Sequence, residues 1–386
     1  MANNNDNKVL NVPPLRFPEF SGEWKMCTIG ELTTKVGSGV TPRGGEAVYK
    51  TEGHPFVRSQ NVGLGNLLLD DIAFIDEETH LRQKNTELQF NDVLLNITGA
   101  SIGRSALVDK QIVGGNVNQH VCIIRTKENL VPSFICSFLL SNYGQRQIDS
   151  FQAGGNRQGL NFEQIKSIKI TIPSKDEQIK IAKLLRAIDE RIATQNKIID
   201  KLQSLIKGLR VCCMQRNGSN NVYLSEIAQI YQPQTISSAE LTEDGFLVYG
   251  ANGIIGKYKD YNHETEQICI TCRGNTCGMV NYTKPMSWIT GNAMVINTDK
   301  YQDKVCKRYL YHYLSAYNFN SIISGSGQPQ IVRTPLEKLK ITLPTISEQK
   351  QKAIIFDKIQ DKIDINHKVL NLYIGQKQYL LRQMFI

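Results

Sequence analysis

The sequence has no long apolar run and no pattern of paired cysteines. A membrane-spanning helix needs about 18 or more consecutive apolar residues, and no such stretch occurs in the 386 residues. The first residues contain no apolar signal core. The nine cysteines are an odd number, and Cys122 and Cys269 stand in apolar segments that favour strands. We therefore expect a cytoplasmic protein with reduced, packed thiols and no membrane contact.

Recognisable catalytic and metal-binding motifs are missing as well. Gly250–Lys257 resembles a phosphate-binding loop, but its spacing is one residue too long and Tyr258 replaces the hydroxyl that binds magnesium. A β-hairpin turn is favoured there instead. Cys269, Cys272 and Cys277 lack the second close pair of ligands that a zinc site usually has. We expect no catalytic residue, no metal and no cofactor in this chain.

The composition is that of an ordinary folded protein. Hydrophobic residues make up 41% and charged residues 21%, and the length suits two domains better than one core. The net charge is +9, because 45 basic side chains outnumber 36 acidic ones. A positive excess favours a polyanionic partner such as a nucleic acid without requiring one.

One internal repeat is clear. Ile168–Pro173 (IKITIP) matches Leu339–Pro344 (LKITLP) at a shift of 171 residues, and the match continues through Glu177-Gln178 and Glu348-Gln349. In each copy apolar and polar residues alternate, which predicts a half-buried strand. The proline ends the strand because it cannot donate to a neighbouring strand.

A helix start follows each of these strands. Ser174 with Glu177, and Thr345 with Glu348, have the spacing of a capping box, in which the hydroxyl and the carboxylate each accept from the other residue's amide. The sequence therefore predicts an α+β fold of two β-rich globules, each followed by a long helix. The predicted boundaries are 1–173 for the first globule, 174–212 for the central helix, 213–344 for the second globule and 345–386 for the second helix.

Both predicted helices carry a heptad seam, which must be buried against another helix. Each seam contains one amide, Gln195 or Asn366, at the same repeat position. We expect the two helices to form an antiparallel coiled coil about 50 Å long; the alternative is that each packs on its own globule. The seam positions are Leu185, Ile188, Ile192, Gln195, Ile199, Leu202, Ile206 and Leu209 in the first helix, and Phe356, Ile359, Ile363, Asn366, Leu370, Tyr373, Lys377 and Leu380 in the second.

The globules share landmarks but differ in their loops. Gly99–Gly103 parallels Gly274–Gly278, and Asn118 parallels Asn292. A shared frame with unlike loops suits a scaffold that holds two recognition surfaces, and the loops are rich in Arg, Asn and Gln, which can form paired hydrogen bonds with base edges. The predicted DNA-contacting residues are Arg43, Arg58, Gln60, Asn61, Arg104, Asn116, Gln119, Asn156, Arg157 and Gln158 in the first globule, and Tyr249, Asn252, Lys257, Arg273, Asn275, Asn292, Gln328, Gln330 and Arg333 in the second.

Taken together, the chain resembles the specificity subunit of a type I restriction-modification system. The resemblance covers essentially the whole chain and rests on Leu15–Trp24 (LRFPEFSGEW), the duplicated strand-Pro-x₃-Glu-Gln-helix unit, Tyr249–Gly253 (YGANG) and Thr290–Asn292 (TGN). One departure is Pro329, where a smaller polar residue is expected. That departure leaves the conformation of its loop open.

The resemblance implies that each globule is a target recognition domain that reads one half of a bipartite site in double-stranded DNA. The coiled coil would set the gap between the half-sites. Two modification subunits would dock on it, and restriction subunits would join them. These partners would use S-adenosylmethionine, ATP and Mg, whereas the chain itself would be non-catalytic. Two alternatives stay open: a self-contained enzyme that cuts or modifies DNA, and a coiled-coil adaptor without DNA function.

Overall fold

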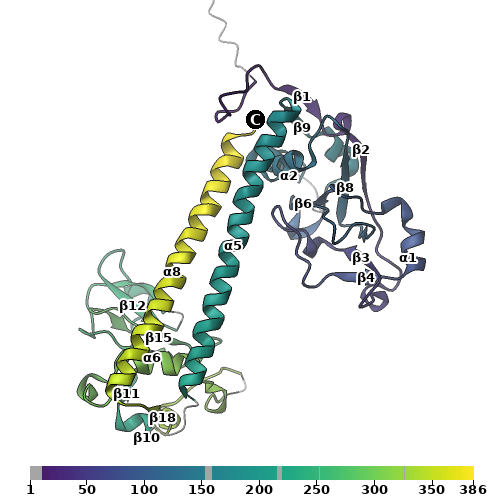
Figure 1. Cartoon of the computed structure of the whole chain (residues 1–386). Coiled ribbons are helices and arrows are strands. Elements are labelled where there is room, and N and C mark those ends of the chain that lie inside the picture. The colour runs from purple at the N-terminus through teal and green to yellow at the C-terminus, as the bar shows by residue number, and fades with distance from the viewer. Residues whose placement is uncertain (1–10, 153–158, 215–219, 252, 326) are drawn as a thin grey trace, which may run out of the picture. The chain divides into compact units, whose positions relative to one another are not determined.

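The computed structural model describes residues 11–152, 159–214, 220–251, 253–325 and 327–386, which belong to two compact units (Figure 1). Unit 1 runs up to Gln195 and resumes at Val369, whereas unit 2 is Asn196–Lys368. Each unit therefore holds one β-rich globule and part of each long helix. Among the described residues, no helix combines the length and the apolar character that crossing a membrane requires.

The globule of unit 1 alternates short strands with short helices. Its described elements are β1 (Lys25–Thr28), β2 (Thr33–Ser38), β3 (His54–Val57), β4 (Ala73–Ile75), α1 (Glu77–Arg82), β5 (Val93–Asn96), β6 (Ser105–Leu107), β7 (Asn116–Val117), β8 (Val121–Thr126), α2 (Pro132–Leu140), α3 (Asn142–Ser150), α4 (Phe162–Ser167) and β9 (Lys169–Ile172). The long helix α5 (Lys175–Met214) follows and continues into unit 2.

Unit 2 begins within α5 and ends within the second long helix. Its described elements are β10 (Asn220–Tyr223), β11 (Gln229–Tyr231), β12 (Phe246–Gly250), β13 (Gly253–Tyr258), β14 (Ile268–Thr271), β15 (Val280–Tyr282), β16 (Trp288–Ile289), β17 (Ala293–Asn297), α6 (Lys307–Ala316), α7 (Arg333–Glu337), β18 (Lys340–Leu343) and the start of α8 (Ile346–Gln383). The antiparallel pairing of β12 with β13 confirms the hairpin predicted in this region.

The two globules have the same strand order. In unit 1, β1 pairs with β9, a four-stranded sheet has the order β2-β8-β5-β6, and a three-stranded sheet has the order β4-β3-β7. Unit 2 has the same arrangement with every strand number raised by nine: β10-β18, β11-β17-β14-β15 and β13-β12-β16. The pairs β3–β7 and β12–β16 are both parallel. The repeat therefore extends over the whole globule, far beyond the segments that match in sequence.

Glycines mark the same turn in both globules. Gly99 and Gly103 follow β5 with φ angles of 72° and 85°, and Gly274 and Gly278 follow β14 with φ angles of 85° and 91°. A side chain with a Cβ rarely adopts this left-handed conformation, so glycine is the favoured residue at all four positions. The predicted parallel between these two segments is confirmed.

Each globule buries its apolar core between the four-stranded sheet and a helix. The central strands β5 and β14 are fully buried, as expected for strands covered on both faces. In unit 1, Phe134 and Phe138 of α2 pack in the same cluster as Trp24. In unit 2, Tyr309 and Leu310 of α6 hold the corresponding place. Burying each large side chain contributes about 1.5–3 kcal/mol.

A repeated glutamine joins each long helix to its globule. Gln178 is 1% exposed, and its Oε1 accepts from the Val131 amide at 2.9 Å. Gln349 is also 1% exposed, and its Oε1 accepts from the Cys306 amide at 2.8 Å. Each side-chain nitrogen donates to the carbonyl of the proline that ends the preceding strand, at 3.1 and 2.9 Å. Because a buried amide without partners is costly, this bonding explains why the glutamine occurs at the same place in both copies.

The capping boxes differ between the copies. Glu348 Oε2 accepts from the Thr345 amide at 3.0 Å, and Thr345 Oγ1 accepts from the Glu348 amide at 3.4 Å, which confirms the second box. Ser174 Oγ also accepts from the Glu177 amide at 3.4 Å. However, the buried Glu177 carboxylate accepts two 2.7 Å bonds from Arg16 rather than one from the cap amide. In the first box, therefore, only the hydrogen bond to the serine hydroxyl is confirmed.

The two long helices pack against each other within unit 1. Asp189 of α5 forms an ion pair of 2.6 Å with Lys377 of α8. Burial nevertheless raises the pKa of Asp189, because desolvation outweighs this lysine. The Arg191 guanidinium lies 5.9 Å from the ring centre of Tyr373. In this unit the early part of α5 thus meets the late part of α8.

The opposite ends of the two helices meet within unit 2. Ile206 of α5 packs with Phe356 and Ile363 of α8, and Leu202 and Ile359 lie beside them. The late part of α5 therefore contacts the early part of α8. Together with the pairing in unit 1, this shows that the coiled coil is antiparallel, as predicted (Figure 1).

One seam position differs from the prediction. Leu209 is 36% exposed, and the half-buried side chain at this turn is Arg210, so the prediction for Leu209 is wrong. The other predicted seam residues are buried or half-buried. Gln195 is 8% exposed, and the Asn366 side-chain nitrogen donates to the Lys362 carbonyl at 2.6 Å.

Candidate nucleic-acid interface

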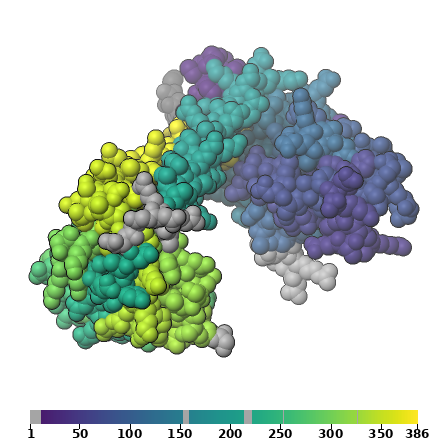
Figure 2. Space-filling view, turned by 60° about the horizontal axis from the view of Figure 1, so that its bottom comes forward, coloured from purple at the N-terminus to yellow at the C-terminus, as the bar shows by residue number. Residues whose placement is uncertain are grey.

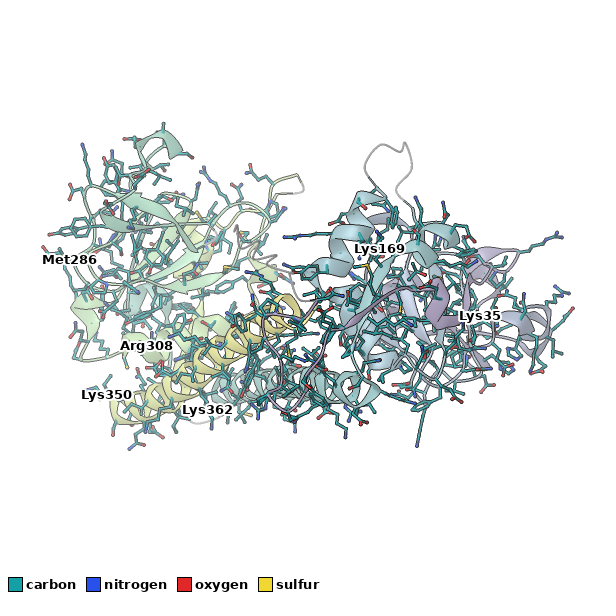
Figure 3. All side chains as sticks on the ribbon, turned by 90° about the horizontal axis from the view of Figure 1, so that it is seen from above. Lys35, Lys169, Met286, Arg308, Lys350 and Lys362 are labelled. Carbon is teal, nitrogen blue, oxygen red and sulfur yellow. The ribbon has the colours of Figure 1, made fainter. Side chains whose placement is uncertain are left out.

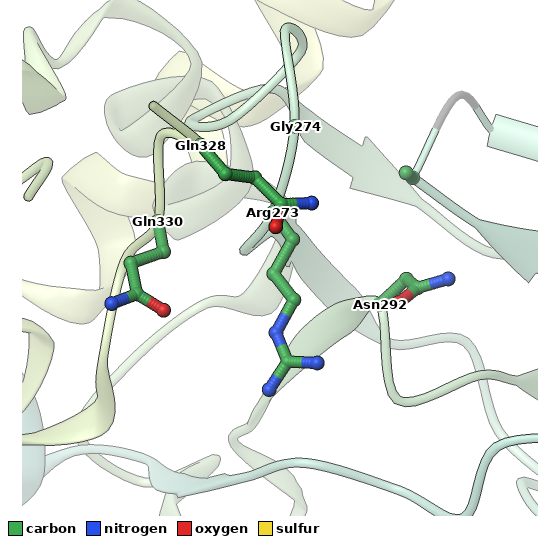
Figure 4. Close-up of a pocket in the computed structure, with 6 residues that line it drawn as sticks. Arg273, Gly274, Asn292, Gln328 and Gln330 are labelled. Atoms are coloured by element: carbon green, nitrogen blue, oxygen red, sulfur yellow. The ribbon is translucent and has the colours of Figure 1, made fainter. Parts of the chain in front are cut away.

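Four of the predicted DNA-contacting residues of unit 2 line one surface hollow, which we call the loop hollow. Arg273 follows β14, Asn292 precedes β17, and Gln328 and Gln330 precede α7. Figure 4 shows the Arg273 side chain between those of Gln330 and Asn292. The loop hollow encloses about 330 Å³ and is lined by Ala251, Arg273, Gly274, Asn292, Gln328 and Gln330.

Backbone hydrogen bonds hold these loops together. The Gly274 amide donates to the Pro329 carbonyl at 3.0 Å, and the Cys272 amide donates to the Asn292 carbonyl at 3.0 Å. Pro329 contributes a carbonyl, which proline retains, and its missing N–H is not needed for this bond. The unusual proline is therefore compatible with an ordered loop.

Asn292 is positioned by residues that carry no recognisable motif in the sequence. The Gln232 side-chain nitrogen donates to the Gly291 carbonyl and lies 3.4 Å from Cys272 Sγ. A Cβ atom at Gly291 would collide with Thr235 Oγ1, so this position requires glycine. The only sequence signal was the tripeptide that contains Gly291. Gln232 and Thr235 are about 60 residues away in sequence and could not be linked to it.

Unit 1 carries different side chains at the equivalent positions. The Ile97 amide donates to the His120 carbonyl at 3.0 Å, which is the bond equivalent to the one that fixes Asn292. His120 is therefore the counterpart of Asn292, and the predicted alignment with Asn118 is wrong by two residues. Thr98 Oγ1 lies 2.6 Å from His120 Nδ1 and occupies the position of the arginine in the loop hollow.

Some of the remaining candidates of unit 1 are exposed, and others form hydrogen bonds with residues of their own globule. The Arg58 side chain is 15% exposed, and its Nη2 donates to the Asp71 carbonyl at 2.7 Å. The Gln119 side-chain oxygen accepts from the Thr41 amide at 3.0 Å. The exposed candidates are Arg43, Gln60, Arg104 and Gln119. The candidates Asn156, Arg157 and Gln158 lie outside the described residues.

Two predicted DNA-contacting residues of unit 1 are corrected by the structure. Asn61 is fully buried, and its amide nitrogen donates to the Leu68 carbonyl and to Asp71, both at 2.9 Å. Asn116 is fully buried too, and its Oδ1 lies 2.7 Å from His80 Nδ1. Because these amides are bonded inside the globule, they hold loops in place and are removed from the candidate surface.

In unit 2, Tyr249 is corrected in the same way. It is 5% exposed, its hydroxyl accepts from the Lys284 amide at 3.1 Å, and burial raises its pKa. Lys257 is half-buried with its ammonium 3.5 Å from Asp244, and Arg333 Nε donates to Glu337 at 2.7 Å. The candidate Asn275 is exposed, and the candidate Asn252 lies outside the described residues.

The thiols and other metal-ligating side chains do not cluster in the described part of the chain. No group of three or more His, Cys, Asp and Glu residues there could hold a metal ion. Cys269 is fully buried in β14, and desolvation raises its pKa to about 12. A thiol in this environment packs as a small apolar group.

Comparison with known proteins agrees with this architecture. The family model of the type I restriction modification DNA specificity domain matches residues 21–204 and 217–372. The putative type I restriction enzyme MjaX specificity subunit of Methanocaldococcus jannaschii is 22% identical over 405 positions, covering 94% of this chain and 92% of the relative. The EcoprrI specificity subunit of Escherichia coli is 31% identical over 140 positions, about a third of either chain (35% and 34%).

Solved structures show the same fold. The S subunit of a type I restriction-modification system from M. genitalium superposes with a TM-score of 0.66 at 17% identity, covering 97% of this chain and 99% of that one. A chain from a study of assembly and conformational transition of the type I R-M system gives a TM-score of 0.56 at 15% identity, with coverages of 95% and 98%. Given the two family matches and the duplicated nine-strand globule, the chain belongs to the family of type I restriction-modification DNA specificity subunits.

Proposed function

We propose that this chain reads a bipartite target in double-stranded DNA, one half with each globule. The observation that carries the proposal is the loop hollow, where Arg273, Asn292 and Gln328 converge from three separate loops. Arginine pairs with the O6 and N7 atoms of guanine, and asparagine and glutamine pair with the N6 and N7 atoms of adenine. Side chains of these types, on loops that are held together by backbone hydrogen bonds, are suited to the recognition of base edges.

The two globules are proposed to read different sequences. They share strand order and register, but unit 1 carries Thr98 and His120 where unit 2 carries Arg273 and Asn292. A common frame with unlike side chains at equivalent positions supports two recognition surfaces of different specificity. The net charge of +9 supports sequence-independent attraction to the phosphates of either half-site.

The chain is further proposed to direct partner subunits without a catalytic centre of its own. Two modification subunits would dock on it and transfer a methyl group from S-adenosylmethionine. Restriction subunits that use ATP and Mg would translocate and cut the DNA. The names of the similar proteins support this division of labour, because each is described as a specificity subunit of a type I restriction enzyme.

The proposal is tested by sequencing methylated bases in cells that carry the modification subunit with and without this chain. We expect an interrupted methylated motif that depends on this chain. Absence of any chain-dependent motif would refute the proposed function. Incubation of the purified chain alone with DNA, Mg, S-adenosylmethionine and ATP separates it from a self-contained enzyme, for which turnover is expected. A salt series of duplex binding separates it from a DNA-free adaptor.

A single substitution tests the assignment of one half-site to unit 2. Because one paired contact contributes about 1–3 kcal/mol of base discrimination, Arg273→Ala should relax only one half of the motif. The exposed Lys300, which does not line the loop hollow, provides the matched control Lys300→Ala. Relaxation spread evenly over both halves would contradict the one-globule, one-half assignment.

A further inference from the structure

Unit 2 contains a second hollow, away from the predicted DNA-contacting loops. It lies where the late part of α5 meets the end of α6 and the early part of α8, and we call it the helix hollow. It encloses about 370 Å³. The residues that line it are Gln203, Ile206, Lys207, Arg210, Val211, Ser315, Ala316, Gln360 and Ile363. None of them was predicted to contact DNA.

The lining combines apolar surface with positive charge. Ile206, Val211 and Ile363 supply much of the wall, whereas Lys207 and Arg210 supply two cations. No carboxylate is present among the described residues that line the hollow. Because apolar and cationic groups stand side by side, the site fits an acidic protein segment better than the phosphates of DNA, which offer no apolar group.

Arg210 lacks a carboxylate of its own. Its Nη2 donates to His312 Nδ1 at 2.8 Å, and His312 Nε2 donates to Asp357 at 2.7 Å. Asp357 is already paired with Arg308, whose Nε lies 3.0 and 3.1 Å from the two carboxylate oxygens. Figure 3 shows Arg308 beside α8, the helix that carries this carboxylate. The group therefore holds two guanidinium cations and one carboxylate.

The surroundings of Arg210 penalise its charge. Its Nε is buried and has no hydrogen-bond partner. Desolvation lowers the pKa of Arg210, which is the direction expected for a cation held without sufficient compensation. A partly buried cation that lacks an anion is a cost to the folded state. An external carboxylate would remove this cost.

Unit 1 shows what fills the equivalent space in the other copy. At the repeat shift of 171 residues, Ile206 and Gln360 correspond to Lys377 and Asp189, which form an ion pair of 2.6 Å. Lys377 Nζ also donates to the Leu64 carbonyl at 3.1 Å. In unit 1 this place therefore has its own carboxylate and is closed by a loop of the same globule.

The closing loop has no counterpart in unit 2. It belongs to the segment 58–72, which joins β3 to β4, whereas β12 ends at Gly250 and β13 already begins at Gly253, with which Gly250 pairs. A Cβ atom at Gly65 would lie 3.2 Å from Lys377 Nζ, so the loop packs closely on the helices in unit 1. Unit 2 therefore leaves open a site that unit 1 closes.

We propose that the helix hollow is a docking site for an acidic segment of the modification subunit, whose carboxylate pairs with Arg210 and Lys207. Apolar side chains of the same segment would cover Ile206 and Ile363. The inference rests on the proposed function, in which that subunit binds this chain. It adds that this contact is specific to the second repeat, because the first repeat has filled the equivalent place.

The outer surface next to the hollow supports a protein partner. Leu205 and Leu209 on α5 are 49% and 36% exposed, and Val211, which lines the hollow, is 36% exposed. The side chains of α5, in teal, are open to view in the space-filling picture (Figure 2). Exposed apolar side chains beside a cationic hollow are of the kind found at protein interfaces.

The test uses the full chain and its modification subunit, with affinity measured across a salt series. Arg210→Leu installs the residue type found at the equivalent Leu381 of unit 1. We expect affinity to fall about tenfold and the salt dependence to become shallower, because a charge-assisted bond is lost. The exposed Lys197, outside the hollow, provides the control Lys197→Gln, which should leave affinity unchanged.

Each other outcome decides against one of the two proposals. Unchanged subunit affinity in Arg210→Leu, or a loss of DNA affinity instead, would overturn the docking site. If Arg210→Leu fails to fold, Lys207→Gln carries the test, with a smaller loss of affinity expected and no loss overturning the site. If the wild-type chain does not bind the subunit, the proposed function fails.

The hollow is then tested by itself, by comparing the melting temperature of the chain in sodium succinate and in sodium chloride at equal ionic strength. A melting temperature that succinate raises in the wild type but not in Arg210→Leu supports a carboxylate site. Equal shifts of the melting temperature in the two proteins overturn it.

Discussion

Lowering the pH from 7 to 5 should destabilise unit 2, in large part through the buried His312. The His312 side chain is fully buried, donates to Asp357 and accepts from Arg210, which fixes a neutral imidazole. Desolvation is the main reason that its pKa falls from 6.5 to about 4. Between these two values only the unfolded chain binds the proton, so the free energy of unfolding decreases as the pH falls below 6.5.

The size of the effect follows from the two pKa values. One pKa unit corresponds to about 1.4 kcal/mol, so the full difference is about 3.5 kcal/mol and is reached only below pH 4. Between pH 7 and pH 5 the expected loss is about 2 kcal/mol. The pKa of Asp357 is lowered too, but that carboxylate contributes only at still lower pH.

The assay is urea unfolding followed by tryptophan fluorescence. The sequence has two tryptophans, Trp24 and Trp288, and Trp24→Phe leaves a single reporter in unit 2. In this background, His312→Gln should abolish about 2 kcal/mol of the loss between pH 7 and pH 5. His367 is exposed on α8, so His367→Gln should retain the full loss. An equal loss in His312→Gln and its parent would refute the assignment of the pH dependence to this histidine.

Two further predictions concern packing. Phe385 is fully buried with its ring centre 5.2 Å from that of Phe134, so Phe385→Ala should lower the free energy of unfolding of unit 1 by about 3–5 kcal/mol in the same kind of urea titration. Burial raises the pKa of Cys122 and Cys269 to about 12, whereas Cys212 is exposed. A thiol reagent followed by peptide mass spectrometry should therefore label Cys212 in the native protein, and the two buried thiols only after unfolding.

The packing predictions have internal controls. Phe90 is 56% exposed in unit 1, so Phe90→Ala should cost far less than Phe385→Ala. Equal costs for the two substitutions would show that Phe385 does not belong to the core of this unit. Labelling of Cys122 or Cys269 at the native-state rate of Cys212 would contradict the buried positions assigned to them.

Features set by local periodicity could be predicted from the sequence. The strand that ends at Pro173, the helix start at Thr345 and the seam that includes Ile188 each follow from alternation, capping or heptad spacing over a few residues. These patterns can be recognised without knowledge of the fold, because residues close together in the sequence specify them. The antiparallel direction was expected because Gln195 lies near the middle of its helix, where equivalent positions of an antiparallel pair can meet.

Features that depend on distant residues could not be predicted. Asn116 looks like any polar loop residue until β7 places it against His80, 36 residues away in sequence. Glu177 has the spacing of a capping box, yet Arg16 takes its carboxylate from 161 residues away. Whether an amide points into a globule or onto its surface depends on such contacts, so the candidate surface could only be narrowed once the fold was known. For the same reason Asn118, rather than His120, was predicted to be the counterpart of Asn292.

The division of α8 between the two units has a consequence for biosynthesis. Unit 1 is completed by residues 369–386, which the ribosome makes only after all of unit 2. At about 5–20 residues per second, the synthesis of Asn196–Lys368 takes roughly 10–35 s. During this interval Leu185 and Ile188 cannot be buried against the end of α8, because that part of the helix has not yet been translated. The nascent first globule must therefore be sheltered or tolerate exposure, and codons that slow translation within unit 2 would lengthen the period in which it is prone to aggregate.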